Sequence, residues 1–338
     1  MPLAGAGWRG VLAAAFLLLL TGASVDRRWQ WGLPDGMAPP PVPADNPMSA
    51  AKVALGRRLF YEADLSIDGT MSCATCHGQR SGFTDGATTH AGVHGDPGLR
   101  NVPSLINVAW KNPLNLADPH MILLEQQAMV PILGDDPVEM GMKGQERGAA
   151  RRLKRNPCYR RLFRAAFPQE KGRIAMETIG KALAAYQRTI ISFDTPWDRA
   201  RAGGAPLPEA ARRGEALFNG KAGCVSCHGG VNFTDNRLHP ALSSERDSGV
   251  MRATGRPQDK GLFRTPGLRH VALTAPYWHD GHIRTLDGAI AAHDLPPDIA
   301  PDAEERADII AFLGQLSDPA ITRDPRFAVP PEQCEINA

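Results

Sequence analysis

The pentapeptide Cys-x-x-Cys-His occurs twice in this chain of 338 residues, at 73–77 and at 224–228. Two thiols three positions apart lie on one side of a turn, where they can bond two adjacent vinyl groups of one porphyrin. The histidine that follows then points at the iron as its proximal ligand. The pattern is typical of covalent attachment of a c-type haem. It predicts two haem sites, made by Cys73, Cys76 and His77 and by Cys224, Cys227 and His228.

Other uses of paired cysteines fit the spacing less well. A zinc site joins two cysteine pairs about 15–20 residues apart, whereas these pairs begin at residues 73 and 224. A thioredoxin-like pair needs a βαβ context, and no run of the chain alternates convincingly with period two. The chain has six cysteines, too few for a disulfide scaffold. The remaining two, Cys158 and Cys334, are either buried thiols or paired with each other, and we assign them no function.

Composition excludes two broad classes. Lys and Arg total 38 and Asp and Glu total 36, so the net charge of +2 gives no reason to expect a nucleic-acid partner. Hydrophobic residues make up 43% and charged residues 22%, which excludes disorder of the whole chain.

The N-terminus has the pattern of an export signal. Arg9 precedes the apolar run 11–20, and small residues follow at 21–24. A retained membrane anchor is the alternative, but the run is shorter than the roughly 20 residues that span a bilayer. We therefore predict a signal peptide over 1–24, no stable membrane anchor and a periplasmic or otherwise exported protein. Residues 25–45, rich in proline, are expected to form an extended lead-in.

Three features recur in the same order around each haem motif, which indicates an internal duplication. Leu-Phe ends a helical segment at 59–60 and at 217–218, the haem motif follows, and Phe-Thr-Asp comes next at 83–85 and at 233–235. Helical periodicity predicts helices over 50–61, 177–193 and 304–317. The expected fold is mainly α with little sheet: two c-type cytochrome domains in tandem, at 46–203 and 204–338, with a linker at 201–208.

Several longer segments resemble the bacterial di-haem cytochrome c peroxidase and MauG superfamily, from about residue 46 to residue 317. The segments at 124–131 and 137–141, and those at 263–269 and 273–281, carry this likeness. The runs 100–113 and 185–192 look closest to the MauG-like branch, which includes the MbnH enzymes that oxidise a side chain of a partner protein.

The resemblance implies that peroxide reacts at the haem on His77, with Gln127 and Glu139 on its distal side. Heterolysis of H₂O₂ needs a group that takes a proton from one oxygen and delivers it to the other. Glu139 has that chemistry, and Gln127 can hold peroxide by hydrogen bonds. The alternative for Glu139 is a solvated surface carboxylate. Peroxidases of the superfamily often close this haem with a distal histidine, for which His94, with His90 nearby, is a weaker candidate.

The resemblance also implies a calcium ion between the two haems. Asn101, Thr274 and Pro276 match its ligand positions, and calcium prefers oxygen ligands, including backbone carbonyls. The alternative is a plain contact between loops.

Two positions depart from the superfamily pattern. The sixth ligand of the second haem is Met in the peroxidases and Tyr in MauG-like enzymes, but the corresponding position here is His293. This predicts a bis-His haem on His228 and His293, with His279 and His282 as fallback ligands. The tryptophan that often mediates transfer between the haems is replaced by Leu116, with Trp110 six residues earlier, which puts a MauG-style charge-sharing state in doubt.

Three functions follow as hypotheses. The first is reduction of hydrogen peroxide with electrons from a small donor protein, a cytochrome c or a cupredoxin, relayed through the second haem. The second is MauG-like oxidation of a partner protein with peroxide. The third is pure electron transfer, which requires that both irons are closed by two protein ligands.

Overall fold

The computed structural model describes residues 29–241, 247–332 and 334, so the predicted signal peptide lies outside the described residues. The chain divides into two compact units, 1–30 and 31–338, and the second contains both haem motifs. Within the described residues, no helix is both long and apolar enough to cross a membrane. The described part of the predicted lead-in, 29–45, contains no helix or strand, although Pro40 is buried.

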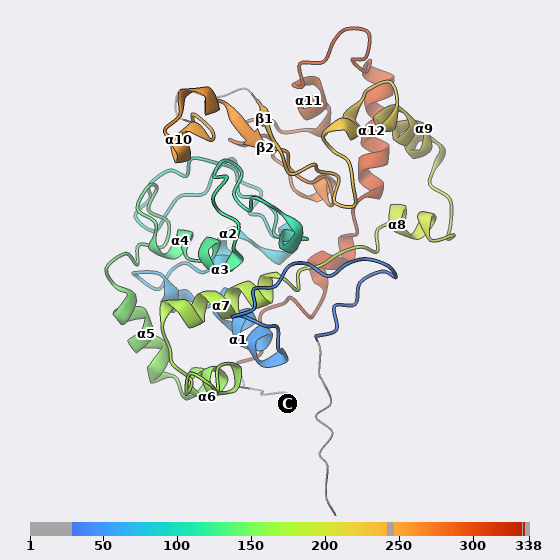
Figure 1. The fold of residues 1–338 in the computed structure, drawn as a ribbon. Helices are drawn as coiled ribbons and strands as arrows, with labels where there is room; N and C mark the ends of the chain where they lie inside the picture. Colours follow the sequence, from blue (N-terminus) through green and yellow to red (C-terminus); the bar gives the residue numbers. More distant parts are fainter. Residues whose placement is uncertain (1–28, 242–246, 333, 335–338) are drawn as a thin grey trace, which may run out of the picture. The chain divides into compact units, whose positions relative to one another are not determined.

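The described chain is mostly helical, as predicted (Figure 1). One short sheet pairs β1 (Leu238–Pro240) with β2 (Leu262–Arg264), antiparallel, with Leu238 opposite Arg264. The helices before the linker are α1 (Ala50–Phe60), α2 (Cys73–Cys76), α3 (Leu124–Gln127), α4 (Val130–Leu133), α5 (Glu146–Arg155), α6 (Pro157–Ala166), α7 (Met176–Gln187) and α8 (Pro196–Arg201). Those after it are α9 (Glu209–Asn219), α10 (Met251–Thr254), α11 (Leu286–Ala291) and α12 (Ala303–Gln315).

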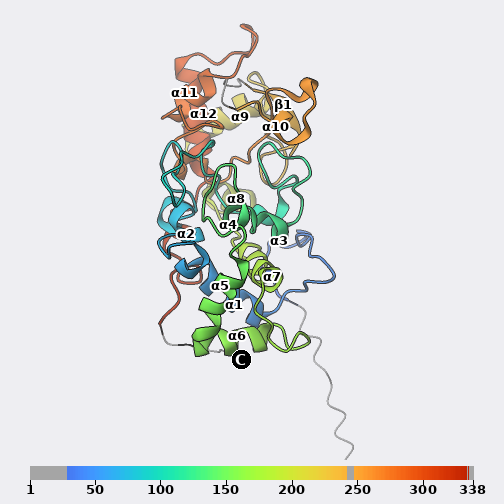
Figure 2. The ribbon, with the colours of Figure 1, turned by 90° about the vertical axis from the view of Figure 1, so that its left-hand side faces the viewer.

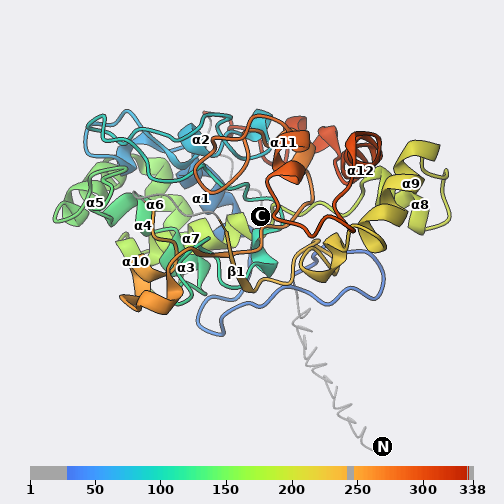
Figure 3. The same ribbon diagram turned by 90° about the horizontal axis from the view of Figure 1, so that it is seen from above.

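The same helix crossing occurs once on each side of the linker. Helix α1 packs on α7, and α9 packs on α12, and Figures 2 and 3 show the two pairs well separated within this unit. A glycine stands at each crossing: a Cβ on Gly56 would lie 1.9 Å from the Ala182 carbonyl oxygen, and one on Gly214 would lie 1.9 Å from that of Asp308. Only glycine permits so close an approach of two backbones. These glycines are equivalent in the two copies of the repeat, as the predicted duplication requires.

The prediction of a helix over 177–193 was too long, because α7 ends at Gln187. The segment that follows is bound instead by Asn107. Its backbone N–H donates to Ile190 O at 2.8 Å, and its side chain both donates to Ser192 O and accepts from Ser192 N. A long-range pairing that satisfies both backbone groups of Ser192 therefore overrides the local helical periodicity.

The end of the chain returns to the first core. After α12, Ile321 and Phe327 are buried among the residues packed around α1 and α7. The Phe327 carbonyl accepts hydrogen bonds from Tyr61 at 2.6 Å and Tyr186 at 3.2 Å. The predicted second domain, 204–338, thus contributes residues to both cores, and its boundaries stay a prediction.

A disulfide between Cys158 and Cys334 fastens this returning tail to α6, which resolves the two alternatives left open by the sequence. The bridge closes a loop of 176 residues and so removes much conformational freedom from the unfolded chain. Replacing both cysteines with serine in the haem-loaded protein should lower the free energy of unfolding by about 2–5 kcal/mol. Urea unfolding followed by circular dichroism measures this. An unchanged midpoint would show that the bridge contributes nothing to stability.

Candidate functional site

The first haem motif presents an imidazole prepared for metal binding. His77 caps α2, and its Nδ1 donates a hydrogen bond of 3.0 Å to the Phe83 carbonyl. This bond fixes the tautomer and leaves Nε2 as the free ligand atom. Burial lowers the pKa of His77 to about 4, so the imidazole is neutral. Cys73 and Cys76 form no disulfide and keep their thiols for thioether bonds.

The second motif repeats this arrangement. His228 Nδ1 donates to the Phe233 carbonyl at 3.2 Å, and burial lowers the pKa of His228 to about 4. Phe83 and Phe233 both have positive φ, 62° and 55°. The repeated Phe-Thr-Asp therefore has a function that the sequence did not reveal: its phenylalanine turns a carbonyl toward the haem-binding histidine. With the free thiols of Cys224 and Cys227, the donor set fits a second c-type haem.

His293 faces His228 across a space of the right size for a metal ion. The two ring centroids lie 6.3 Å apart. An ion held between two imidazoles by bonds of about 2 Å separates the ring centroids by roughly 6 Å. His293 Nδ1 donates to the Ala289 carbonyl at 2.8 Å, so its Nε2 is also left for a metal. The pair His228 and His293 therefore fits axial ligation from both sides.

The two fallback histidines have other contacts. His279 is buried, stacks on Phe263 with ring centroids 4.2 Å apart, and lies 3.5 Å from Asp247. His282 is exposed and pairs with Asp280. Of these histidines, the one whose ring meets that of His228 is His293.

The segment that carries Glu139 pairs with the backbone of α4, four residues after Gln127. Met140 N donates to Pro131 O at 2.9 Å, which places Glu139 next to the turn of helix that follows Gln127. Burial raises the pKa of Cys73 and of Cys76, and the charge of the nearby Glu139 carboxylate adds to both shifts. Burial raises the pKa of Glu139 itself, although the neighbouring His90 opposes this shift. Glu139 is half-buried, unlike a solvated surface carboxylate.

Gln127 carries an unsatisfied polar atom on a firmly held helix. Its Oε1 is buried and accepts no hydrogen bond. Helix α3 is anchored by Glu125, which accepts a bidentate pair from Arg188 at 2.7 and 2.9 Å and a further bond from Asn46. Burial alone would raise the pKa of Glu125, but these hydrogen bonds lower it, so the anchor is ionised. A buried acceptor without a protein partner is free to accept a hydrogen bond from a ligand.

The candidate distal histidines lie on the loop that packs against Glu139. Val93 N donates to Glu139 O at 2.7 Å. His94 is exposed, whereas His90 Nδ1 donates to the buried Asp85 carboxylate at 2.9 Å. His90 therefore lies beside Glu139 with its ring held by Asp85, and a distal-ligand role for His94 stays a prediction.

The three candidate calcium ligands converge on one loop. Asn101 Nδ2 donates to Ala87 O at 2.8 Å, which turns its Oδ1 away from that carbonyl. A Cβ on Gly82 would lie 3.3 Å from the Thr274 side chain, and one on Gly86 would lie 4.0 Å from the carbonyl just before Pro276. The sequence-distant segments around residues 101 and 275 thus both meet the loop 82–88.

Between the motifs, Leu116 packs beside Val250 and Phe263. Trp110 meets Phe193 edge-on, with ring centroids 5.2 Å apart. The substitution at Leu116 therefore leaves an aliphatic contact where the superfamily often has an aromatic one.

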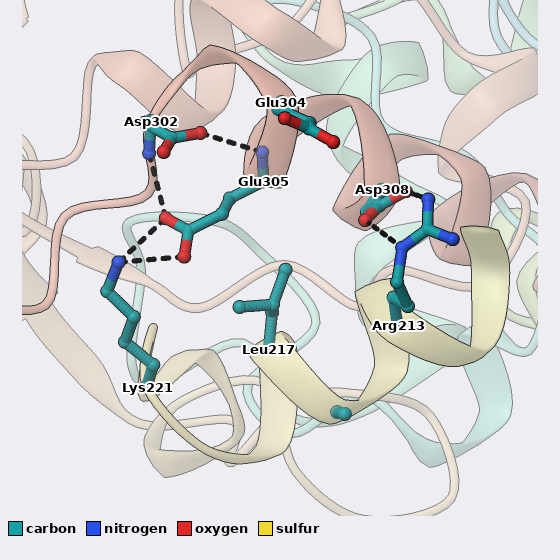
Figure 4. Close-up of a pocket in the computed structure, with 8 residues that line it drawn as sticks. Arg213, Leu217, Lys221, Asp302, Glu304, Glu305 and Asp308 are labelled. Atoms are coloured by element: carbon teal, nitrogen blue, oxygen red, sulfur yellow. Dashed lines mark hydrogen bonds and ion pairs between the residues drawn. The ribbon is translucent and has the colours of Figure 1, made fainter.

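An open hollow of about 460 Å³ lies between α9 and α12 (Figure 4). Four of its charged residues form ion pairs: Arg213 with Asp308 at 2.7 Å, and Lys221 with Glu305 at 2.7 Å. No cysteine or histidine lines it, so it is a poor candidate site.

Sequence reasoning missed a further part of the duplication. The segment 101–113 repeats at 264–276, with Pro-x-Leu-x-x-Val-Ala at 103–109 and at 266–272. In both copies a residue with positive φ, Asn107 or His270, begins a short 3-10 helix. The backbones of Pro103 and Pro266 interact with His77 and His228 respectively. Aligning the two halves of the sequence from the haem motifs onward reveals this repeat without a structure.

Comparison with known proteins gives a consistent result. A family profile described as "Di-haem cytochrome c peroxidase" matches residues 50–205. The chain is 35% identical to cytochrome-c peroxidase IdrP1 of Denitromonas iodatirespirans, over 94% of this chain and 95% of that protein. It is 36% identical to the methylamine utilization protein MauG of Methylorubrum extorquens, over 85% and 84%. A solved structure of a "MauG-like protein associated with microbial copper homeostasis" superposes with a TM-score of 0.84 at 38% identity, covering 89% of this chain and 99% of that one.

Proposed function

Because the chain belongs to the di-haem cytochrome c peroxidase and MauG family, with two c-type haems, we propose that it reduces hydrogen peroxide at the His77 haem. Electrons would reach that haem through the haem on His228 and His293. The donor would be a small redox protein, a cytochrome c or a cupredoxin. The chain is thus a peroxidase-type oxidoreductase, and the site residues below are our assignment.

The observation that carries this proposal is the asymmetry of the two motifs. A second imidazole faces His228, so that site is suited to a haem with both axial positions filled, as in electron carriers. The side chains assigned to the distal side of the other haem, Gln127 and Glu139, are weak or hard ligands but good hydrogen-bonding and proton-transfer groups. One site is thus suited to electron transfer and the other to peroxide.

A haem bound at His77 supplies the iron at which peroxide is reduced. The protein's own groups hold and protonate the substrate. The buried Gln127 Oε1 accepts a hydrogen bond from peroxide, and the amide N–H of the same side chain can donate one. Glu139 takes a proton from one peroxide oxygen and returns it to the other, so that water leaves. Burial raises the Glu139 pKa toward the range where a carboxyl both accepts and donates a proton.

Spectra of the ferric protein test this assignment. We expect a high-spin signal from one haem and a bis-His low-spin signal from the other in optical and EPR spectra. Two low-spin haems that stay closed after half reduction would overturn the peroxide function and favour a pure electron carrier.

Oxidation of a partner protein is a second candidate function, favoured by the close match to MauG and to the MauG-like structure. Steady-state turnover of peroxide with reduced cytochrome c distinguishes the two. Rapid turnover supports the peroxidase. No turnover, together with peroxide-dependent modification of a side chain in a co-expressed neighbouring-gene protein, would support the MauG-like reaction.

We further propose that the protein is exported to the periplasm and that residues 1–24 are removed. This rests on the apolar run after Arg9 and on c-type haem being attached outside the cytoplasm. N-terminal sequencing of the haem-loaded protein should begin at Val25. A mature chain that retains Met1 would contradict the cleavage.

Calcium binding by Asn101, Thr274 and Pro276 is a separate proposal, supported by their meeting at the loop 82–88. Replacing Asn101 with alanine should weaken calcium binding by about tenfold or more, because one of few protein oxygen ligands is lost. Calorimetric titration of chelator-treated holoprotein measures this. Asn219→Ala, at an exposed position on α9, is the control and should bind like the wild type. Equal affinities of both variants would contradict the site.

A further inference from the structure

Arg264 is a buried cation whose charge has no protein counterpart in the described part of the chain. Its side chain is 3% exposed, and its Nε has no hydrogen-bond partner. One terminal nitrogen donates to the Thr265 carbonyl at 2.8 Å, but no carboxylate of residues 29–241, 247–332 or 334 pairs with it. Burial lowers the pKa of Arg264 to about 10. Buried charges are normally paired, so this one calls for an anion.

Lys111 is a second basic residue close by, and it is half-buried. Its ammonium donates to the Ser104 carbonyl, and within the described ranges no carboxylate pairs with it. Burial, and then the charge of Arg264, lower the pKa of Lys111 to about 7. An anion between or beside two cations that repel each other in a region of low dielectric stabilises both charges, and without an anion the lysine loses its proton.

The two cations stand next to the two haem-binding histidines. Lys111 donates to Ser104, the neighbour of Pro103, whose backbone interacts with His77. Arg264 donates to Thr265, the neighbour of Pro266, whose backbone interacts with His228. The charge of Lys111 also lowers the pKa of His77. The pair therefore lies between the two haem sites.

The internal duplication places other residues at the positions equivalent to Lys111 and Arg264. Aligning 101–113 with 264–276 matches Asn101 with Arg264, and Lys111 with Thr274. Each copy also contacts the loop after its haem motif, although through different groups. The Asn101 side chain donates to Ala87 O, two residues after Asp85, whereas the backbone N–H of Thr265, the neighbour of Arg264, donates to Arg237 O, two residues after Asp235. The position equivalent to the candidate calcium site is therefore occupied by a lysine and an arginine.

We propose that Lys111 and Arg264 bind propionate carboxylates of the two haems, as a basic counterpart of the candidate calcium site. The inference rests on haem binding at both motifs but does not require that calcium is bound. A planar guanidinium and an ammonium are suited to charge-assisted hydrogen bonds with carboxylates, and such bonds satisfy the unpartnered Nε of Arg264. The pair would hold the two haems in register and stabilise their reduced states.

Spectroelectrochemical titration of the haem-loaded variants tests this. Arg264→Gln removes a positive charge that disfavours the ferric state. The equilibrium constant for reduction of the His228 haem should therefore fall about tenfold, which lowers its potential by about 60 mV for one electron. Lys111→Met should act mainly on the His77 haem in the same direction. Arg264→Lys keeps the charge and should stay within about threefold of wild type. Arg237→Gln is the matched control, because it removes an exposed charge from the residue whose carbonyl accepts a hydrogen bond from Thr265 N.

A shift in Arg264→Gln no larger than in Arg237→Gln would overturn the proposal. A crystal structure of the haem-loaded protein covers the case in which the variants do not fold. Propionate oxygens within hydrogen-bond distance of both Lys111 and Arg264 support the proposal, and a protein carboxylate in that place refutes it. A pyridine haemochrome assay distinguishes failure of the proposed function from failure of this inference. Fewer than two haems per chain would refute the proposed function itself. Two haems per chain without these contacts would refute only this inference.

Discussion

Replacing Glu139 with glutamine should slow the reaction of the ferric protein with hydrogen peroxide by about 10²–10⁴-fold, the usual contribution of a positioned general acid and base. Glutamine has the same shape as glutamate but cannot accept a proton from one peroxide oxygen and return it to the other. Stopped-flow measurement of the second-order rate constant gives the effect directly. The ferric spectra of both haems should stay as in the wild type, because the replacement does not change an axial ligand.

The pH dependence of this rate should identify the same group. Burial raises the pKa of Glu139 above its ordinary value of 4.5. The carboxylate is the base, so the rate constant should fall as the pH drops through that raised pKa, and Glu139→Gln should lose this limb of the profile. Glu304→Gln, at an exposed position in the first turn of α12, is the matched control and should react like the wild type. A wild-type rate constant in Glu139→Gln would remove Glu139 from the mechanism.

Local signals in the sequence were enough to predict what depends on short spacing. The spacing within 73–77 and 224–228 predicted the paired thiols and histidines, and periodicity predicted the helices now seen as α1 and α12. Counting from Pro276 led to His293, whose ring does face His228. The sequence pattern could not predict the distance between these rings. That distance depends on where α11 ends, because the end of the helix turns residue 293 toward the other histidine.

Contacts between distant segments were the part that could not be predicted. Periodicity continued past Gln187, but Asn107 binds Ser192 and ends the helix. The tail that carries Phe327 lies in the half of the sequence that follows the second haem motif, yet it is buried in the first core. Both outcomes depend on which partner satisfies a buried backbone or apolar group, and the partner is more than 80 residues away in each case.

The unpaired charge of Arg264 is another feature that could not be predicted from the sequence. In the sequence it is one of many basic residues in a chain of nearly balanced charge, and nothing marks it as unpaired. Only its burial and the absence of a carboxylate among the described residues around it separate it from surface arginines such as Arg237. The repeat that matches it with Asn101 is visible in the sequence, but its meaning depends on the contacts.

Replacing His293 with alanine should abolish the bis-His low-spin signal in the EPR spectrum of the ferric protein. The His77 haem would keep its high-spin signal, and the His228 haem, with one imidazole left, would become high-spin or water-bound. Losing one electron-donating imidazole should also raise the potential of that haem. His282→Ala is the matched control, because His282 is the fallback ligand that pairs with Asp280 instead of facing His228.

Together, His293→Ala and His282→Ala decide which histidine is the second ligand of the His228 haem. The 6.3 Å between the rings of His228 and His293 leaves room for one iron with an imidazole on each side, so the signal must depend on His293 and be indifferent to His282. An unchanged spectrum in His293→Ala would refute this ligand, and loss of the signal in His282→Ala would assign it to that residue. His293→Met should keep a low-spin haem but raise its potential above that of the wild type, because a thioether stabilises ferric iron less than an imidazole does.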